Sequence, residues 1–238
     1  MTDINLPLFN RNAINPVSCL MEGWQLIKNQ YWLFLGMSLV GVLAGSMVPL
    51  GVLLGPMMCG LHLAFFRTSQ GEPVKFEELF KGFDYFMQSV VATLIQIVPL
   101  MLLMIPTYVG GVVALIPTII KANSHHRMTP SDLTAFAILY GTIFGVALVG
   151  SLIVGVFFVF TYPLIVDRGL PGVAAVKTSA RAAVANLVGV FSLTVLIMCL
   201  SFAGMLFCYV GALLVLPIGL AARHVAYKQV FGFATTTT

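Results

Sequence analysis

The chain carries very few charges. Only 8% of its 238 residues are charged, whereas 59% are hydrophobic. A typical soluble domain is about 45–50% apolar and about 25% charged, so a soluble fold of this composition would lack the polar side chains that cover a surface. The composition, with a mean hydropathy of +1.01, therefore excludes a soluble enzyme and predicts an integral membrane protein.

Ionisable and catalytic groups are also scarce inside the apolar runs. All eight acidic residues lie outside them. Because proton- and ion-coupled carriers place ionisable groups at membrane depth, a pump or proton-coupled carrier is disfavoured. The chain contains no GxSxG, HExxH or P-loop motif, and no carboxylate or histidine accompanies a Ser or Thr of the apolar runs at a suitable depth. We therefore predict that the protein is not an enzyme and has no catalytic or cofactor-binding residue.

Metal and nucleic-acid sites are disfavoured as well. The four cysteines form no CxxC pair, and the adjacent His125 and His126 are followed only by Asp132. Adjacent side chains of a helix or strand point apart, so we predict no metal site there. The basic residues behind the net charge of +4 are dispersed rather than clustered, which argues against nucleic acid as a partner. For His62 a packed polar residue is favoured over a contact with lipid phosphate.

Uncharged apolar runs dominate what remains. They cover 32–66, 89–120, 133–166 and 187–222. A helix crosses the bilayer core with about 20 residues, so the first and last runs each accommodate two helices. The first would break near Pro49–Gly51 or at Gly55–Pro56, giving spans at about 32–49 and 53–67, and the last would turn between Phe202 and Gly211. The two middle runs each form one span, which makes six.

The distribution of basic residues predicts the orientation. With six spans, ten Lys and Arg residues fall on one side, whereas only Lys121 and Arg127 fall on the other. Basic residues concentrate on the cytoplasmic side of inner-membrane proteins. Both termini are therefore expected in the cytoplasm, with the protein in the inner (plasma) membrane.

A pattern recurs three times along the chain. A proline stands 16 residues before the start of an apolar run in three places, as Pro16 before Trp32, Pro73 before Ser89 and Pro171 before Leu187. Proline fits the first turn of a helix, and each intervening segment has apolar residues at helical spacing opposite basic ones. The predicted fold is an all-α polytopic transmembrane bundle in which six spans form three hairpins. Each hairpin follows an amphipathic interfacial helix, in a single domain over 1–238 with units 13–68, 72–166 and 170–230.

Short motifs carry a family resemblance. They are FTYPLIVDRGL over 160–170, Gly55-Pro56 with Gly60-Leu61, Arg67, Gly71-Glu72, FEELFKGF over 76–83, and Asn29-Gln-Tyr-Trp32 at the start of a hairpin, where relatives show Asn-Trp-Trp. The chain resembles a group of uncharacterised bacterial six-span membrane proteins, and it is similar to the membrane domain of membrane-anchored glycerophosphodiester phosphodiesterases. The resemblance implies a polytopic helical protein with both termini inside. It implies no activity, because these residues include no phosphodiesterase domain. In the third unit, Asn186-Leu-Val188 departs from the Asn-Trp-Trp motif of the relatives.

Three functions remain open. The leading hypothesis is a non-enzymatic protein that organises membrane lipids or partner membrane proteins, including copies of itself. Its candidate contacts to lipid phosphates are Lys75, Lys81, Lys177 and Arg181. The alternatives are a transporter or channel for a small or lipophilic solute, and a subunit of a larger membrane complex. Candidate residues of a solute path are Thr93, Gln96, Pro99, Pro106 and Thr107, where prolines would break the span.

The two middle runs are too long for simple crossings. About 32 helical residues measure roughly 48 Å, whereas the hydrocarbon core is about 30 Å thick. We therefore expect apolar extensions near 112–120 and 133–142 to pass the outer interface. They would either pack on each other and on a partner, or bend at Pro117 and lie on the membrane.

Overall fold

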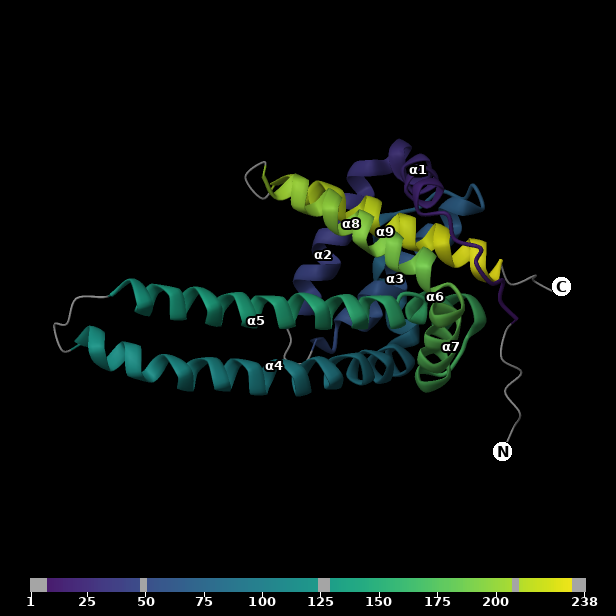
Figure 1. Ribbon diagram of the computed structural model, residues 1–238. Helices are drawn as coiled ribbons and strands as arrows, with labels where there is room; N and C mark the ends of the chain where they lie inside the picture. The colour runs from purple at the N-terminus through teal and green to yellow at the C-terminus, as the bar shows by residue number, and fades with distance from the viewer. Residues whose placement is uncertain (1–7, 48–50, 124–128, 207–209, 233–238) are drawn as a thin grey trace, which may run out of the picture. The chain divides into compact units, whose positions relative to one another are not determined.

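The computed structural model describes residues 8–47, 51–123, 129–206 and 210–232, which form helices and turns without a β-strand (Figure 1). The all-α prediction is confirmed for this part of the chain. In order, the helices are α1 (Pro16–Ile27), η1 (Lys28–Gln30), α2 (Tyr31–Met47), α3 (Leu54–Ser69), η3 (Phe76–Tyr85), α4 (Phe86–Asn123), α5 (Pro130–Phe157), α6 (Thr161–Arg168), α7 (Gly172–Ala185), α8 (Leu187–Met205) and α9 (Val210–Phe231).

Five helical stretches among the described residues are long and apolar enough to cross a membrane. They are Pro16–Met47, Phe76–Ile116, Pro130–Arg168, Leu187–Met205 and Val210–Phe231. The predicted span at about 53–67 corresponds to α3, which has only 16 residues and is not one of the five. By length and composition, the structure is that of a multi-pass membrane protein.

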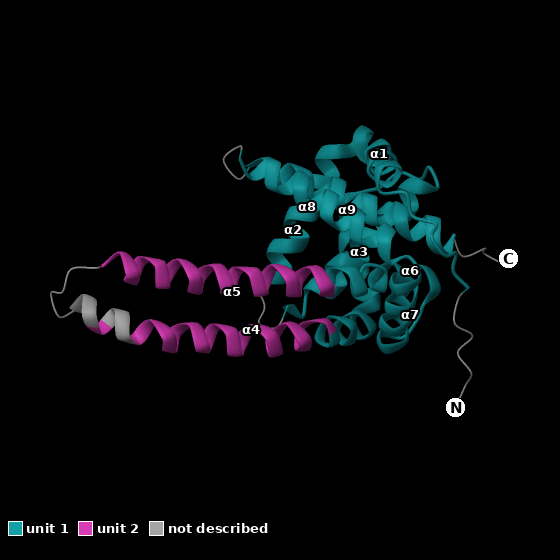
Figure 2. Ribbon diagram, in the orientation of Figure 1, with its two compact units in different colours: residues 1–95, 155–238 teal, residues 96–154 magenta. Residues whose placement is uncertain are grey.

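The chain divides into two compact units (Figure 2). One comprises residues 1–95 and 155–238, and the other comprises residues 96–154. The smaller unit consists of the parts of α4 and α5 that run side by side, where Gly150 lies against Leu103 and Gly111 against Ile143. In the larger unit, α3 contacts α1, α2, η3, α6 and α9, and its apolar side chains contribute to both hydrophobic core clusters.

The chain turns between α2 and α3 close to the predicted position. Helix α2 ends at Met47 and α3 begins at Leu54, and Gly51 adopts a φ of +60°, which glycine tolerates without strain. Residues 48–50, which include Pro49, lie outside the described residues. The alternative break at Gly55–Pro56 is wrong, because both residues lie in the first turn of α3, where a proline costs no hydrogen bond.

The predicted span over 133–166 is interrupted. Helix α5 ends at Phe157 and α6 begins at Thr161, because Pro163 offers no N–H and its ring would clash with the carbonyl four residues earlier in a continuous helix. Ser179 of α7 satisfies backbone groups at the break. Its Oγ donates to the carbonyl of Phe157 at 2.8 Å and accepts from the N–H of Phe160 at 3.1 Å.

The three segments predicted as interfacial helices form α1, η3 and α7, although η3 is a 3₁₀ helix. They pack on their neighbours through small residues: Gly23 meets the backbone of Ala222, and Gly82 meets that of Gly60. Their exposed large apolar side chains are Val17, Met21, Trp24, Phe76, Phe80, Phe83, Val173 and Val184. Most of the apolar residues predicted at helical spacing in these segments therefore face outward, whereas Ile27 and Leu79 are buried.

Helix α4 continues without interruption through its prolines to Asn123. The chain therefore has no break at Pro99 and Pro106, which only the transporter alternative required, and it stays helical past Pro117. Residues 112–120 are helical rather than a loop.

Candidate functional site

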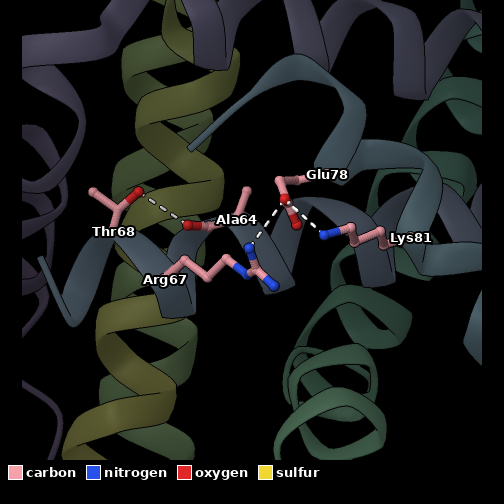
Figure 3. Close-up of polar contacts among 5 residues, drawn as sticks. All are labelled: Ala64, Arg67, Thr68, Glu78 and Lys81. Atoms are coloured by element: carbon pink, nitrogen blue, oxygen red, sulfur yellow. Dashed lines mark hydrogen bonds and ion pairs between the residues drawn. The ribbon is translucent and has the colours of Figure 1, made fainter. Parts of the chain in front are cut away.

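One buried carboxylate holds two basic side chains from different helices (Figure 3). Glu78 Oε1 lies 3.0 Å from Nη1 of Arg67 on α3 and 2.9 Å from Nζ of Lys81 on η3. The Glu78 side chain is only 9% exposed, whereas Arg67 and Lys81 are 34% and 47% exposed. The cluster keeps one net positive charge, and its carboxylate fixes both cations at the surface. Lys81, a predicted lipid contact, therefore also belongs to a structural ion pair.

Lys75 occupies the N-cap position of η3 and is exposed. Among the described residues no carboxylate forms an ion pair with it. It lies beside the exposed Phe76, so the start of η3 presents a cation next to an apolar ring.

The other two predicted lipid contacts lie on the exposed face of α7, one helical turn apart. Lys177 and Arg181 are both exposed, and α7 contains no acidic residue. Arg181 lines an open cavity of about 740 Å³ between α7 and the segment that precedes α1. Its lining, hereafter the α7 groove, consists of Phe9, Arg11, Asn12, Ala180, Arg181, Val184 and Ala185.

The fully buried Asn186 anchors the segment before α1, which forms the wall of the α7 groove opposite α7. Its Oδ1 accepts from the N–H of Ala13 at 2.9 Å, and its Nδ2 donates to the carbonyl of Asn10 at 2.9 Å. The N–H of Asn10 in turn donates to the carbonyl of Val230 on α9 at 2.8 Å. The backbone on both sides of Arg11 is therefore anchored, and this restricts the positions that the Arg11 guanidinium can reach.

The predicted solute-path residues all lie on α4 and differ in burial. Thr93 is buried, and its hydroxyl lies 2.8 Å from the carbonyl of Ser89 and 3.1 Å from the hydroxyl of Tyr162. Thr107 donates to the carbonyl of Leu103 at 2.7 Å. Gln96 is half-buried, and Pro99 and Pro106 are exposed on α4. Both threonine hydroxyls are thus bonded to their own helix.

A second buried polar cluster lies between α3 and α9. His62 is 5% exposed, as expected for a packed polar residue, and its ring centroid lies 6.0 Å from that of His224. His224 Nε2 lies 3.3 Å from Ser69 Oγ. This histidine pair was not predicted, because the two residues are far apart in the sequence.

Sequence reasoning also missed two arginines and one asparagine. Arg11 entered it only among the basic residues that predict the orientation, and Arg67 only there and in a family motif, although Arg11 lines a cavity and Arg67 forms an ion pair with a buried carboxylate. Asn186 was noted only as a departure from a family motif. The available signal was an asparagine directly before an apolar run, because an amide buried there must find hydrogen-bond partners.

No group of three or more His, Cys, Asp or Glu residues in the described part of the chain is arranged to hold a metal ion. Of the three residues considered as metal ligands and predicted not to form a site, His125 and His126 lie outside the described residues, while Asp132 accepts hydrogen bonds from the N–H and hydroxyl of Thr129. Comparison with protein-family models, curated proteins and solved structures finds no match for this chain.

Proposed function

We propose that this chain is a non-enzymatic inner-membrane protein that organises anionic lipid at its cytoplasmic face. The observation that supports this is the make-up of three outward faces, those of α1 with the adjoining η1, of η3 with its N-cap residue, and of α7, which combine large apolar and basic side chains. They pair Met21 and Trp24 with Lys28, Phe76 and Phe80 with Lys75, and Val173 and Val184 with Lys177 and Arg181. Helices with such faces lie in the headgroup plane, with apolar side chains toward acyl chains and cations near phosphates.

The proposal includes six spans, arranged as three hairpins with interfacial helices and with both termini cytoplasmic. Helix α3 would be the sixth span, although its 16 residues measure only about 24 Å. Ten of those residues are buried, so protein rather than lipid would surround a short crossing, which membranes tolerate. The ten-to-two distribution of Lys and Arg supports an even number of spans.

Single-cysteine labelling tests this topology. Cysteines placed at 75 and 177 should react with an impermeant reagent only from the cytoplasmic side, and one at 126 only from the outside. Labelling of 75 and 126 from the same side would contradict the six-span arrangement.

Lipid copurification tests the lipid role. We expect Lys75→Glu with Lys177→Glu to lower the ratio of anionic to zwitterionic lipid that copurifies, because each basic residue near the surface contributes about 1 kcal/mol. Lys81 is left intact, since it is paired with Glu78. Lys121→Glu with Arg127→Glu makes the same charge change on the predicted outer side and should leave the ratio unchanged. An unchanged ratio in the first variant would refute the role.

A role as a subunit of a larger complex is the second candidate, supported by the long, apolar α4 and α5. Exposed side chains near their distal ends include Val113, Ile116, Leu133 and Tyr140. Leu133→Ser with Tyr140→Ser should release a partner that copurifies in stoichiometric amount from native membrane. Retention of such a partner by that variant would contradict this candidate. A transporter receives less support, because α4 is uninterrupted and Thr93 and Thr107 are bonded within it.

A further inference from the structure

The α7 groove differs from the other basic surfaces because it is concave. Its volume of about 740 Å³ falls within the range of about 300–1,000 Å³ typical of ligand sites. Its walls come from opposite ends of the chain, with Phe9, Arg11 and Asn12 on one side and α7 on the other. A ligand of headgroup size can therefore be contacted from two sides rather than from a flat face.

The charge of the α7 groove is entirely positive. Arg11 and Arg181 are its charged lining residues, and neither forms an ion pair with a carboxylate among the described residues. The remaining lining is apolar apart from Asn12. Two guanidinium groups above an apolar wall match a phosphate joined to a hydrocarbon, because arginine binds phosphate oxygens in a planar, two-pronged geometry.

The arginines are also held by the fold. Arg11 lies between Asn10 and Ala13, whose backbone groups are both bonded to the side chain of Asn186. The left-handed φ of +50° at Asn12 turns the chain between these anchors. Arg181 precedes Ala182 and Ala183, which are fully buried against the core. Since both backbones are fixed before a ligand arrives, binding costs less ordering of the chain.

We propose that the α7 groove binds one anionic phospholipid of the surrounding membrane, with its phosphate between Arg11 and Arg181 and its glycerol and acyl portion along Phe9, Ala180 and Val184. This inference rests on the proposed lipid role and adds a discrete site to a general cationic surface. The apolar lining beside the two arginines favours a lipid over an acidic protein segment, because it can contact a hydrocarbon chain next to the phosphate.

Native mass spectrometry of the full-length protein in detergent, titrated with phosphatidylglycerol or phosphatidylcholine, tests the site. Wild type should bind one phosphatidylglycerol more tightly than the rest and more tightly than phosphatidylcholine. Arg11→Gln with Arg181→Gln should weaken that first binding at least about tenfold, because two charge-assisted contacts are lost. Ala180→Trp should weaken it equally by filling the groove without changing the charge.

The matched control is Lys28→Gln with Lys75→Gln, which removes the same charge from η1 and from the N-cap of η3. It should reduce the later, weaker binding and leave the first lipid in place. Equal loss of the first lipid in this control, or none in the arginine variant, would overturn the site.

Other occupants give distinct results. Displacement of the lipid by millimolar inorganic phosphate would identify a free-anion site, and a dimer lost in the arginine variant would identify a second copy of the chain. Either result would overturn the proposal. Enrichment of anionic lipid around the wild-type protein in nanodiscs distinguishes failure of the lipid role from failure of the α7 groove site. If no enrichment is seen, the lipid role itself is refuted. If enrichment is seen but no single lipid binds more tightly than the rest, only the groove site is refuted.

Discussion

Arg67 Nη1 on α3 lies 3.0 Å from Oε1 of the buried Glu78 on η3. This ion pair joins two helices that also touch through backbone, where Gly60 meets the carbonyl of Leu79. Because the same oxygen lies 2.9 Å from Nζ of Lys81, two cations share one carboxylate at the junction. The η3 helix is thus fixed to α3 by charge as well as by packing.

Replacing Glu78 with Gln should destabilise the protein by about 1–3 kcal/mol, because two charge-assisted bonds weaken and two cations lose their counter-charge. Thermal unfolding in detergent measures this loss. Glu77→Gln is the matched control, since Glu77 is exposed on the same helix. Equal melting temperatures for the two variants would show that the ion pairs contribute nothing at this junction.

Gly60→Ala should be more damaging than either glutamate variant. A Cβ at this position would overlap the backbone carbonyl of Leu79, which cannot rotate away as a side chain can. We expect a lower yield of monodisperse protein and a lower melting temperature. Gly155→Ala, where the added methyl meets nothing within 4 Å, should be neutral or slightly stabilising, because alanine favours a helix more than glycine does. The prediction fails if both variants behave alike.

The helical class and the turn after α2 were predictable, because hydrophobic run length and proline and glycine positions are local properties. The interruption before Thr161 was not, since it depends on Pro163 together with a serine that belongs to a different helix. The orientation of the apolar stripes was also undetermined. A stripe can face lipid or protein equally well, and the small residues Gly23 and Gly82 decide which side packs.

The candidate site was predictable only in part. Lys177 and Arg181 stand out as basic residues at helical spacing on one segment. The pairing of Arg181 with Arg11 in one groove depends on the course of the segment before α1, which Asn186 fixes. No local pattern in the sequence reports that contact.

Asn186→Ala should release the segment that carries Arg11. Two of the hydrogen bonds of this side chain hold that segment, at Ala13 and Asn10, and each contributes about 1 kcal/mol. Local opening should then increase about tenfold or more, as should the rate at which trypsin cleaves after Arg11. Asn29→Ala, at an exposed position on η1, is the control and should not change the rate. An unaltered cleavage rate in Asn186→Ala would show that other contacts anchor the segment.

Helices α4 and α5 are longer than the membrane core is thick. Helix α4 has 38 residues and α5 has 28, so they measure about 57 Å and about 42 Å. The hydrocarbon core is about 30 Å thick, and a tilt of about 20° absorbs only a few ångströms. In the proposed topology the cytoplasmic end of the span is near Gln88, which would put position 116 about 40 Å along the helix, beyond the core.

Spin labels at 102, 116 and 133 measure this depth in liposomes. We expect the label at 102 to be accessible to oxygen, and those at 116 and 133 to be accessible to a water-soluble nickel complex. The native Ile116 and Leu133 are exposed in the single chain, so apolar surface would then stand outside the bilayer core, where burial against a partner stabilises it. Oxygen accessibility at all three positions would mean that the membrane covers the whole helix pair, and it would remove the main support for the complex-subunit candidate.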